Sequence, residues 1–303
     1  FRPSWYNYVG SLLFMKYRIS VNATAANIGA GFDCMGLSLD LNNVLTVSDE
    51  TDFPLEIVAG ENVPHDESNL IFRSMREVFS LTGKSIGHIK LVQSDSIPHA
   101  SGLGSSAACI AAGVTAANAM LGFPLSEKET VNLCARLDGH PDNVLPALLG
   151  GITAGVMCGD KVEYIRADVD ESICAVALTP DFPLYTELSR KALPSVYPRE
   201  DVVYSLSRAV LSFAAFALKR EDKLHCLDDK LHQPYRKPLI KGYDDAETAL
   251  KEAGALCVFL SGAGPTVMGI FSKSALKDSI CAPEGWTVRK LNFSNKPVSV
   301  TRV

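Results

Sequence analysis

The chain has 303 residues, enough for one large domain or two modest ones, and its 47% hydrophobic and 21% charged residues are typical of a globular protein with a sizeable core. A formal net charge of −5 without any basic run argues against nonspecific nucleic-acid binding. No stretch is long and apolar enough to span a membrane, so small-molecule chemistry is the leading function class.

The strand and helix patterns of the first half can be followed in chain order. Alternation predicts strands over 17–23, 37–41, 44–47 and 86–92, with Asn42-Asn43 joining the second to the third. Apolar residues at helical spacing predict a helix over 70–81, and another begins at Ser105. Ser126 and Glu129 form a capping box that starts a third helix, reaching about Leu137.

The second half of the chain can be followed in the same way. A hairpin is expected from strands over 150–157 and 162–165, followed by an apolar strand over 173–178 and helices over 201–219 and 244–253. Strands over 255–260, 266–271 and 286–291 complete an α+β half. A soft boundary near 165–175 divides the chain into two predicted domains, 15–168 and 169–303.

The eight cysteines form no C-x-x-C pair, and the six histidines show no metal-site spacing. Buried thiols in a reducing compartment fit this pattern, which favours a cytoplasmic protein. Residues 1–14 are expected to be an extension or tag before a natural start at Met15, with a signal peptide as the weaker alternative.

A glycine-rich segment, I-P-H-A-S-G-L-G-S-S-A-A over residues 97–108, carries the strongest chemical signal. Gly102 and Gly104 permit a tight turn and close approach of a ligand, and Ser105 and Ser106 can cap the helix that follows. A helix N-terminus behind such a loop suits phosphate. The segment predicts a nucleotide phosphate loop, although it is neither a Walker A loop nor a dinucleotide fingerprint. A plain Gly-Ser turn is the alternative for the loop taken alone.

With its proline at position 98, this loop resembles the second motif of the GHMP kinase superfamily, P-x-x-x-G-L-G-S-S-A-A. Residues 23–33, A-T-A-A-N-I-G-A-G-F-D, resemble the first motif as homoserine kinases have it, and S-G-A-G-P-T over 261–266 resembles the third. The resemblance implies an α+β, two-domain GHMP kinase fold, with an N-terminal domain like ribosomal protein S5 domain 2 and a ferredoxin-like C-terminal domain. It also implies ATP and Mg²⁺ as cofactors.

Three shorter segments resemble homoserine kinases in particular. They are H-P-D-N over 140–143, T-x-x-x-R-x-x-L-P over 186–194, and P-Y-R over 234–236. Taken without the resemblance, the first predicts a turn, and the arginines predict solvated surface side chains. The resemblance implies ATP-dependent phosphorylation of the L-homoserine hydroxyl to O-phospho-L-homoserine in threonine biosynthesis. The implied partners are small molecules, not nucleic acid or membrane, and a homodimer is left open.

The resemblance also implies roles for individual residues. An arginine fork matches a carboxylate with two parallel hydrogen bonds, which suits Arg190 and Arg236, whereas Asn27 and Asp33 suit an ammonium group. The implied substrate-binding residues are Asn27, Asp33, His140, Asn143, Thr186, Arg190 and Arg236. The implied nucleotide-binding residues are Pro98, His99, Ala100, Ser101, Gly102, Leu103, Gly104, Ser105, Ser106, Ala107, Ala108, Gly262 and Gly264.

Ser106 and Asp138 are the implied Mg²⁺ ligands, and Asp138 stands where the family pattern has a longer glutamate. We therefore expect weaker metal binding and lower turnover. Asn143, implied to orient the reacting hydroxyl, cannot act as a base at neutral pH. The hydroxyl proton passes either to Asp142 or, as we favour, directly to a phosphate oxygen. Asn22 replaces the family's proline, which predicts lower local rigidity.

Three alternatives to a homoserine kinase remain at this point. The first is another GHMP small-molecule kinase that acts on a sugar or a mevalonate-pathway acceptor. Those acceptors lack an α-ammonium group, so the paired arginines with Asn27 and Asp33 argue against them. The second is an ATP-dependent decarboxylase, and the third is a non-catalytic ligand sensor on the same fold.

Overall fold

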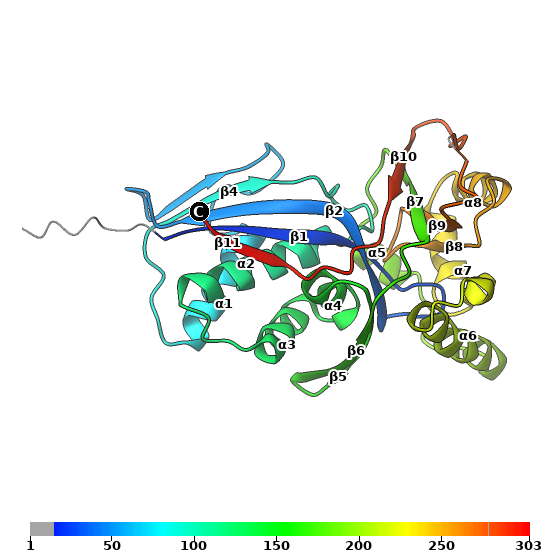
Figure 1. Cartoon of the computed structure of the whole chain (residues 1–303), viewed down its shortest axis with the longest axis horizontal. Helices are drawn as coiled ribbons and strands as arrows, with labels where there is room; N and C mark the ends of the chain where they lie inside the picture. The colour runs from blue at the N-terminus through cyan, green and yellow to red at the C-terminus, as the bar shows by residue number, and fades with distance from the viewer. Residues whose placement is uncertain (1–14, 278) are drawn as a thin grey trace, which may run out of the picture.

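The computed structural model describes residues 15–277 and 279–303, so the predicted extension over residues 1–14 lies outside the described residues. A mixed sheet forms the larger part of the molecule (Figure 1). Its strands run in the order β11-β1-β2-β4-β3, while β5 pairs with β2 and β6 with β5. They are β1 (Lys16–Ala26), β2 (Met35–Ser48), β3 (Leu55–Val58), β4 (Ile89–Ser94), β5 (Ile152–Cys158), β6 (Lys161–Ala167) and β11 (Ser299–Arg302).

Four helices cover one face of this sheet, namely α1 (Leu70–Leu81), α2 (Ser105–Met120), α3 (Glu127–Asp138) and α4 (Pro141–Leu149). Every residue of α2 from Ala107 to Met120 is buried. Small side chains permit this close packing: a Cβ on Gly113 would lie 2.4 Å from the carbonyl oxygen of Ile71 in α1. The sheet and α1 thus hold α2 rigidly, with its N-terminus open to the cavity described below.

A second sheet, in the order β10-β7-β9-β8, forms the other part. Its strands are β7 (Ile173–Pro180), β8 (Cys257–Leu260), β9 (Val267–Ser272) and β10 (Trp286–Leu291). The associated helices are α5 (Thr186–Lys191), α6 (Arg199–Ala217), η1 (Glu221–Cys226), α7 (Gln233–Arg236), η2 (Lys237–Leu239) and α8 (Tyr243–Glu252). Tyr243, Ala246 and Leu250 of α8 share an apolar cluster with strands of this sheet. Among the described residues, no helix combines the length and apolarity needed to cross a bilayer.

Two local predictions were wrong. The predicted strands over 37–41 and 44–47 form one strand, β2, because Asn42 and Asn43 stay paired with β1. Asn43 also accepts the N–H groups of Ser96 and Ile97 through its side chain, at 2.8 and 2.9 Å, so the asparagines do not interrupt the strand. The predicted turn at 140–143 is the start of helix α4, with Pro141 in the first helical position that proline favours.

The last strand crosses back to the first sheet. β11 pairs with β1 in antiparallel register, with Tyr17 opposite Arg302, so the larger sheet uses residues from both sides of the predicted boundary at 168/169. The two domain ranges therefore remain a prediction. The segregation of helices and largely antiparallel sheets agrees with the predicted α+β class.

Candidate active site

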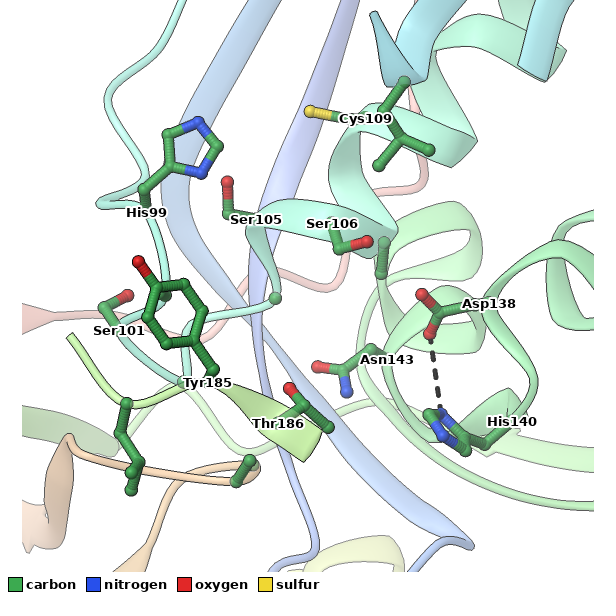
Figure 2. A pocket seen from close by; sticks show the side chains of 18 of the residues that line it. His99, Ser101, Ser105, Ser106, Cys109, Asp138, His140, Asn143, Tyr185 and Thr186 are labelled. Atoms are coloured by element: carbon green, nitrogen blue, oxygen red, sulfur yellow. Dashed lines mark ion pairs between the residues drawn. The ribbon is translucent and has the colours of Figure 1, made fainter. Parts of the chain in front are cut away.

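A cavity of about 560 Å³ lies at the N-terminus of α2, between the two sheets (Figure 2). This volume is typical of small-molecule sites. Residues from all three motifs and from the three shorter segments line it. The predicted site residues in its wall are Asn27, Asp33, His99, Ala100, Ser101, Gly102, Gly104, Ser105, Ser106, Ala107, Asp138, His140, Asp142, Asn143, Thr186, Arg190, Arg236, Gly262 and Gly264.

The glycine-rich loop has a backbone suited to an anion. Ala100, Gly102 and Gly104 have φ angles of 48°, 83° and 71°, so left-handed residues alternate with ordinary ones. Such alternation turns successive N–H groups toward one concave face. The N-cap of α2 is Gly104, and no side chain of the described residues caps the helix, so the prediction that a serine caps it was wrong. The N–H groups of the first turn are free to bind phosphate.

The third motif supports this loop by close backbone contact. Ser261 donates a hydrogen bond from its hydroxyl to the Gly102 carbonyl at 2.8 Å, and Thr266 donates its N–H to the Ser101 carbonyl at 3.1 Å. A Cβ on Gly102 would lie 2.4 Å from the Ser261 carbonyl oxygen. The Gly262 carbonyl accepts from the Asn27 amide at 2.9 Å. The three motifs, distant in sequence, thus form one polar cluster.

Asp33 and Arg190 form a bidentate ion pair at the cavity wall, with N···O distances of 2.8 and 3.1 Å. Both side chains remain about one-third exposed, at 33% and 38%. Arg190 and Thr186 lie four residues apart on α5, so they share one face of that helix. An adjacent anion and cation complement the ammonium and carboxylate of an amino acid.

Arg236 is buried to 1% exposure, and no ion pair among the described residues includes it. Its guanidinium donates to the Gly262 carbonyl at 3.1 Å, while its buried Nε has no hydrogen-bond partner in the described chain. Burial lowers the pKa of this arginine, and Asp33 opposes that effect. A buried cation without a counter-ion is costly, so the position favours an anionic ligand.

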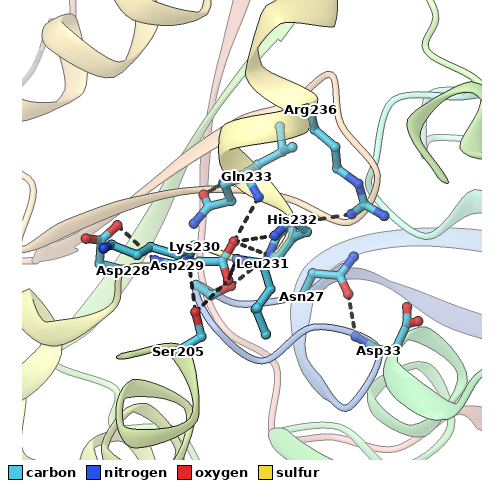
Figure 3. Close-up of polar contacts among 12 residues, drawn as sticks. Asn27, Asp33, Ser205, Asp228, Asp229, Lys230, Leu231, His232, Gln233 and Arg236 are labelled. Atoms are coloured by element: carbon cyan, nitrogen blue, oxygen red, sulfur yellow. Dashed lines mark hydrogen bonds and ion pairs between the residues drawn. The ribbon is translucent and has the colours of Figure 1, made fainter. Parts of the chain in front are cut away.

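His232, which sequence reasoning missed, positions Arg236 (Figure 3). Its Nδ1 lies 3.4 Å from the Arg236 guanidinium, and its Nε2 lies 2.8 Å from the Gly29 carbonyl oxygen. Burial lowers the pKa of His232, which favours the neutral ring that can accept at Nδ1 and donate at Nε2. Phe32 stacks on His232 at 5.2 Å and faces Arg236 at 5.0 Å. The arginine is therefore held on two sides.

An acidic group lies on the opposite wall. Donor atoms of Asp138, His140 and Asp142 lie within 4.8 Å of one another, and His140 Nδ1 is 3.7 Å from both carboxylates. Asp138 and Asp142 raise the pKa of His140 against the effect of burial. Burial raises the pKa of Asp142 to about 7. Figure 2 shows the Ser106 hydroxyl and the Asp138 carboxylate pointing toward one another.

Comparison with known proteins agrees with this geometry. Residues 69–151 match the GHMP kinases N terminal domain, and residues 213–282 match the GHMP kinases C terminal domain. The chain is 42% identical to the homoserine kinase of Moorella thermoacetica over 254 residues, covering 82% of this chain and 86% of that relative. The chain belongs to the homoserine kinase family.

Solved structures place this family member in the same fold. The crystal structure of homoserine kinase from Cytophaga hutchinsonii has a TM-score of 0.82 at 25% identity, covering 94% of this chain and 97% of that one. Mevalonate diphosphate decarboxylase from Enterococcus faecalis, at 15% identity, covers 96% of this chain and 100% of its own with a TM-score of 0.70, a likeness of fold alone. The predicted two-domain GHMP kinase fold is confirmed.

Three residues of the predicted homoserine kinase phosphate loop do not line the cavity. Leu103 and Ala108 are buried in the apolar core, with 0% and 1% exposure. Leu103 instead accepts the N–H of Thr24 at its carbonyl, at 3.1 Å. The Pro98 carbonyl accepts the Ser101 hydroxyl at 2.8 Å. The side chains of these residues therefore shape the loop, and their contacts with a nucleotide stay a prediction.

Sequence reasoning also missed part of the cavity wall. The additional lining residues are Val63, Pro64, Asn69, Leu70, Ile71, Gln93, Cys109, Leu184, Tyr185 and Ala263. Asn69 carries one recognisable signal, since its side chain caps α1 by accepting from two backbone N–H groups. That signal predicts a helix start, not a ligand site, so the apolar wall before α1 could not have been assigned from local pattern.

Proposed function

We propose that this homoserine kinase family member transfers the γ-phosphoryl group of ATP to the side-chain hydroxyl of L-homoserine, in threonine biosynthesis. The observation that carries the proposal is Arg236, a buried guanidinium in the cavity wall without a carboxylate partner in the described chain. Together with the Asp33–Arg190 pair it provides two cations and one anion, which complement a carboxylate and an ammonium group. Sugars and mevalonates offer no ammonium for Asp33.

The nucleotide is proposed to bind at the glycine-rich loop. The backbone N–H groups of residues 100–106 and the N-terminus of α2 hold the phosphates, as the φ pattern of the loop permits. Apolar residues at the start of α1, together with Val63 and Pro64, offer a wall against which the base can pack. Cys109 lies in the same wall and has a pKa raised by burial to about 12, so it acts as an apolar side chain.

Ser106 and Asp138 fit a magnesium ion. Both supply oxygen, the ligand that Mg²⁺ prefers, and the Ser106 hydroxyl makes no hydrogen bond to the described chain. The imidazole of His140 is a poorer magnesium ligand, so His140 is assigned to the acceptor side. When bound, Mg²⁺ neutralises charge on the β- and γ-phosphates.

The chain contributes mainly positioning to the transfer. Arg190 and Arg236 fix the acceptor carboxylate, Asp33 fixes its ammonium group, and Asn143 holds the hydroxyl near the γ-phosphorus. A bond forms between the homoserine oxygen and phosphorus as the bond to the ADP oxygen breaks. The hydroxyl proton passes to a phosphate oxygen. Thr186 and His140 are supporting contacts, and a cytoplasmic location and a homodimer stay predictions.

The test is ADP release by purified protein with ATP, Mg²⁺ and a panel of hydroxylated amino acids, sugars and mevalonates. We expect release with L-homoserine and formation of O-phospho-L-homoserine. Turnover only with a sugar or mevalonate would overturn the acceptor assignment. Nucleotide binding without turnover of any acceptor would instead support a ligand sensor.

A further inference from the structure

Thr24 contacts both the glycine-rich loop and Asn143, although it does not itself line the cavity. It is fully buried on β1, at a point where the pairing with β2 shifts register. Its backbone N–H donates to the Leu103 carbonyl of the glycine-rich loop at 3.1 Å. Its hydroxyl oxygen lies 2.7 Å from Oδ1 of Asn143, at the start of α4. One residue therefore contacts both the loop and the side chain proposed to orient the acceptor.

We propose that Thr24 is a positioning residue that fixes the amide of Asn143 with its NH₂ group toward the acceptor. The inference rests on the proposed function and specifies how Asn143 serves it. A threonine hydroxyl has one proton to donate, and its only hydrogen bond in the described chain is to Asn143. If the amide were rotated, its NH₂ group could donate to the Thr24 hydroxyl, but the hydroxyl proton would lose the acceptor that Oδ1 provides. The orientation with Oδ1 toward Thr24 satisfies both groups and directs the NH₂ group elsewhere.

The neighbouring carboxyl group supports the same amide orientation. Nδ2 of Asn143 lies 3.5 Å from Oδ1 of Asp142. Rotating the amide by half a turn would place its oxygen against that carboxyl oxygen, so two acceptors would face each other when Asp142 is ionised. Thr24 on one side and Asp142 on the other therefore select the same orientation.

This orientation makes Asn143 a donor toward the substrate. Its N–H can bond a lone pair of the acceptor hydroxyl oxygen, while its carbonyl oxygen already accepts the hydrogen bond from Thr24. The hydroxyl hydrogen is then left to face the transferred phosphoryl group, which receives it. Losing the Thr24 hydroxyl leaves only the longer contact with Asp142 to hold the amide, so the acceptor oxygen is held less well while the nucleotide site is retained.

Three variants distinguish the effect of losing the Thr24 hydroxyl from the effect of losing side-chain volume. Thr24→Ser keeps the hydroxyl, Thr24→Val keeps the volume, and Thr24→Ala removes both without adding bulk near Gly104. We expect kcat/KM for homoserine to fall about 10–100-fold in Thr24→Val and Thr24→Ala, the scale on which misplacement of a reacting group acts. Thr24→Ser should stay within about threefold of the parent, and all should keep the parent nucleotide Kd.

The proposal is overturned if Thr24→Ser loses as much activity as the other two, if all three match the parent, or if the loss follows nucleotide Kd. A second readout is the side-chain ¹⁵N–¹H₂ signal of Asn143, assigned by its absence in Asn143→Asp. It should move in Thr24→Val and Thr24→Ala but not in Thr24→Ser, and an unmoved signal also overturns the proposal. If the parent itself does not phosphorylate homoserine, the proposed function fails, and this signal still decides the role of Thr24.

Discussion

Single residues around the cavity differ in whether the protein already uses their polar groups. Both polar atoms of the Asn27 side chain are already hydrogen-bonded. Its NH₂ group donates to the Gly262 carbonyl at 2.9 Å, and its oxygen accepts the Asp33 N–H at 2.8 Å. The Nε of Arg236, by contrast, has no hydrogen-bond partner within residues 15–277 and 279–303. Asn27 therefore shapes the loop that carries Asp33, and its contact with an ammonium group stays a prediction.

Replacing Arg236 tests carboxylate recognition. In Arg236→Leu the KM for homoserine should rise by about 100-fold, because a buried charged contact of about 2–5 kcal/mol is lost. Nucleotide Kd should change little, since the glycine-rich loop is retained. Steady-state kinetics and nucleotide titration measure the two effects, with Arg76→Leu, an exposed arginine on α1, as the control. Equal damage to both affinities would contradict the assignment.

Lengthening Asp138 tests its place at the metal. Asp138→Glu restores the side chain of the family pattern and adds one methylene toward Ser106. We expect equal or higher turnover and a lower Mg²⁺ concentration at half-maximal rate, because the longer side chain brings its carboxylate closer to the ion. Magnesium titration of the rate provides the measurement. An inactive Asp138→Glu with intact nucleotide binding would show that the shorter acid is required.

At the scale of elements, the glycine-rich loop and α2 depend on close approach of other segments. Gly104 both starts α2 and leaves room for Thr24: an added Cβ would lie 1.9 Å from the Thr24 hydroxyl oxygen. Gly122, just after α2, has a similar φ of 78°, but no atom of the part of the chain that the structure describes lies within 4 Å of such a Cβ. Alanine at these two positions therefore separates the cost of a left-handed backbone from the cost of crowding against Thr24.

In Gly104→Ala, Thr24 and the loop must move apart, which displaces the N–H groups of the loop. We expect kcat to fall about 100-fold or more, the scale on which loss of one preorganised hydrogen-bond donor acts. Gly122→Ala carries the same left-handed strain of about 1–2 kcal/mol without the clash, so it should retain activity. Parallel kinetics and melting curves of the two variants distinguish these effects. Equal losses of activity would show that crowding against Thr24 is not what distinguishes Gly104→Ala.

At the scale of the whole molecule, β11, the last strand in chain order, pairs with β1 at the edge of the larger sheet. The two hydrogens of the Asn22 NH₂ group are shared among three acceptors, each 3.0 Å from Nδ2: the hydroxyls of Ser38 and Ser294 and the carbonyl of Lys296. Ser294 and Lys296 belong to the segment that precedes β11. Gly150 is also packed against that segment, since a Cβ there would lie 2.5 Å from the Lys296 carbonyl oxygen. The asparagine that replaces the family's proline thus supplies side-chain hydrogen bonds that proline cannot make.

Removing these hydrogen bonds should weaken the whole fold. Asn22→Ala leaves the buried Ser38 hydroxyl without its Asn22 partner, so we expect the free energy of unfolding to fall by about 1–3 kcal/mol. Thr301→Ala, an exposed position on β11, should change it little. Urea unfolding of both variants measures the difference. An Asn22→Ala protein as stable as the parent would show that β11 pairing alone holds the chain's end.

Much of the local structure followed from sequence. Apolar spacing predicted α1, small residues behind Gly104 predicted α2, and a capping box predicted the start of α3. The phosphate loop and the family motifs could also be predicted, because backbone freedom, N–H donors and charge depend on only a few adjacent residues. The single strand β2 did not follow, because pairing partners decided whether two asparagines interrupt it.

The sequence by itself determined which chemical groups are present and which short segments form helices, strands and the phosphate loop, since these depend on neighbours along the chain. Only the tertiary structure decided which groups meet. Thr24 contacts Asn143 across 119 positions, Arg236 reaches the Gly262 carbonyl, and β11 joins β1. Such contacts depend on the order of strands in a sheet and the packing of helices on it, and no local pattern encodes that order.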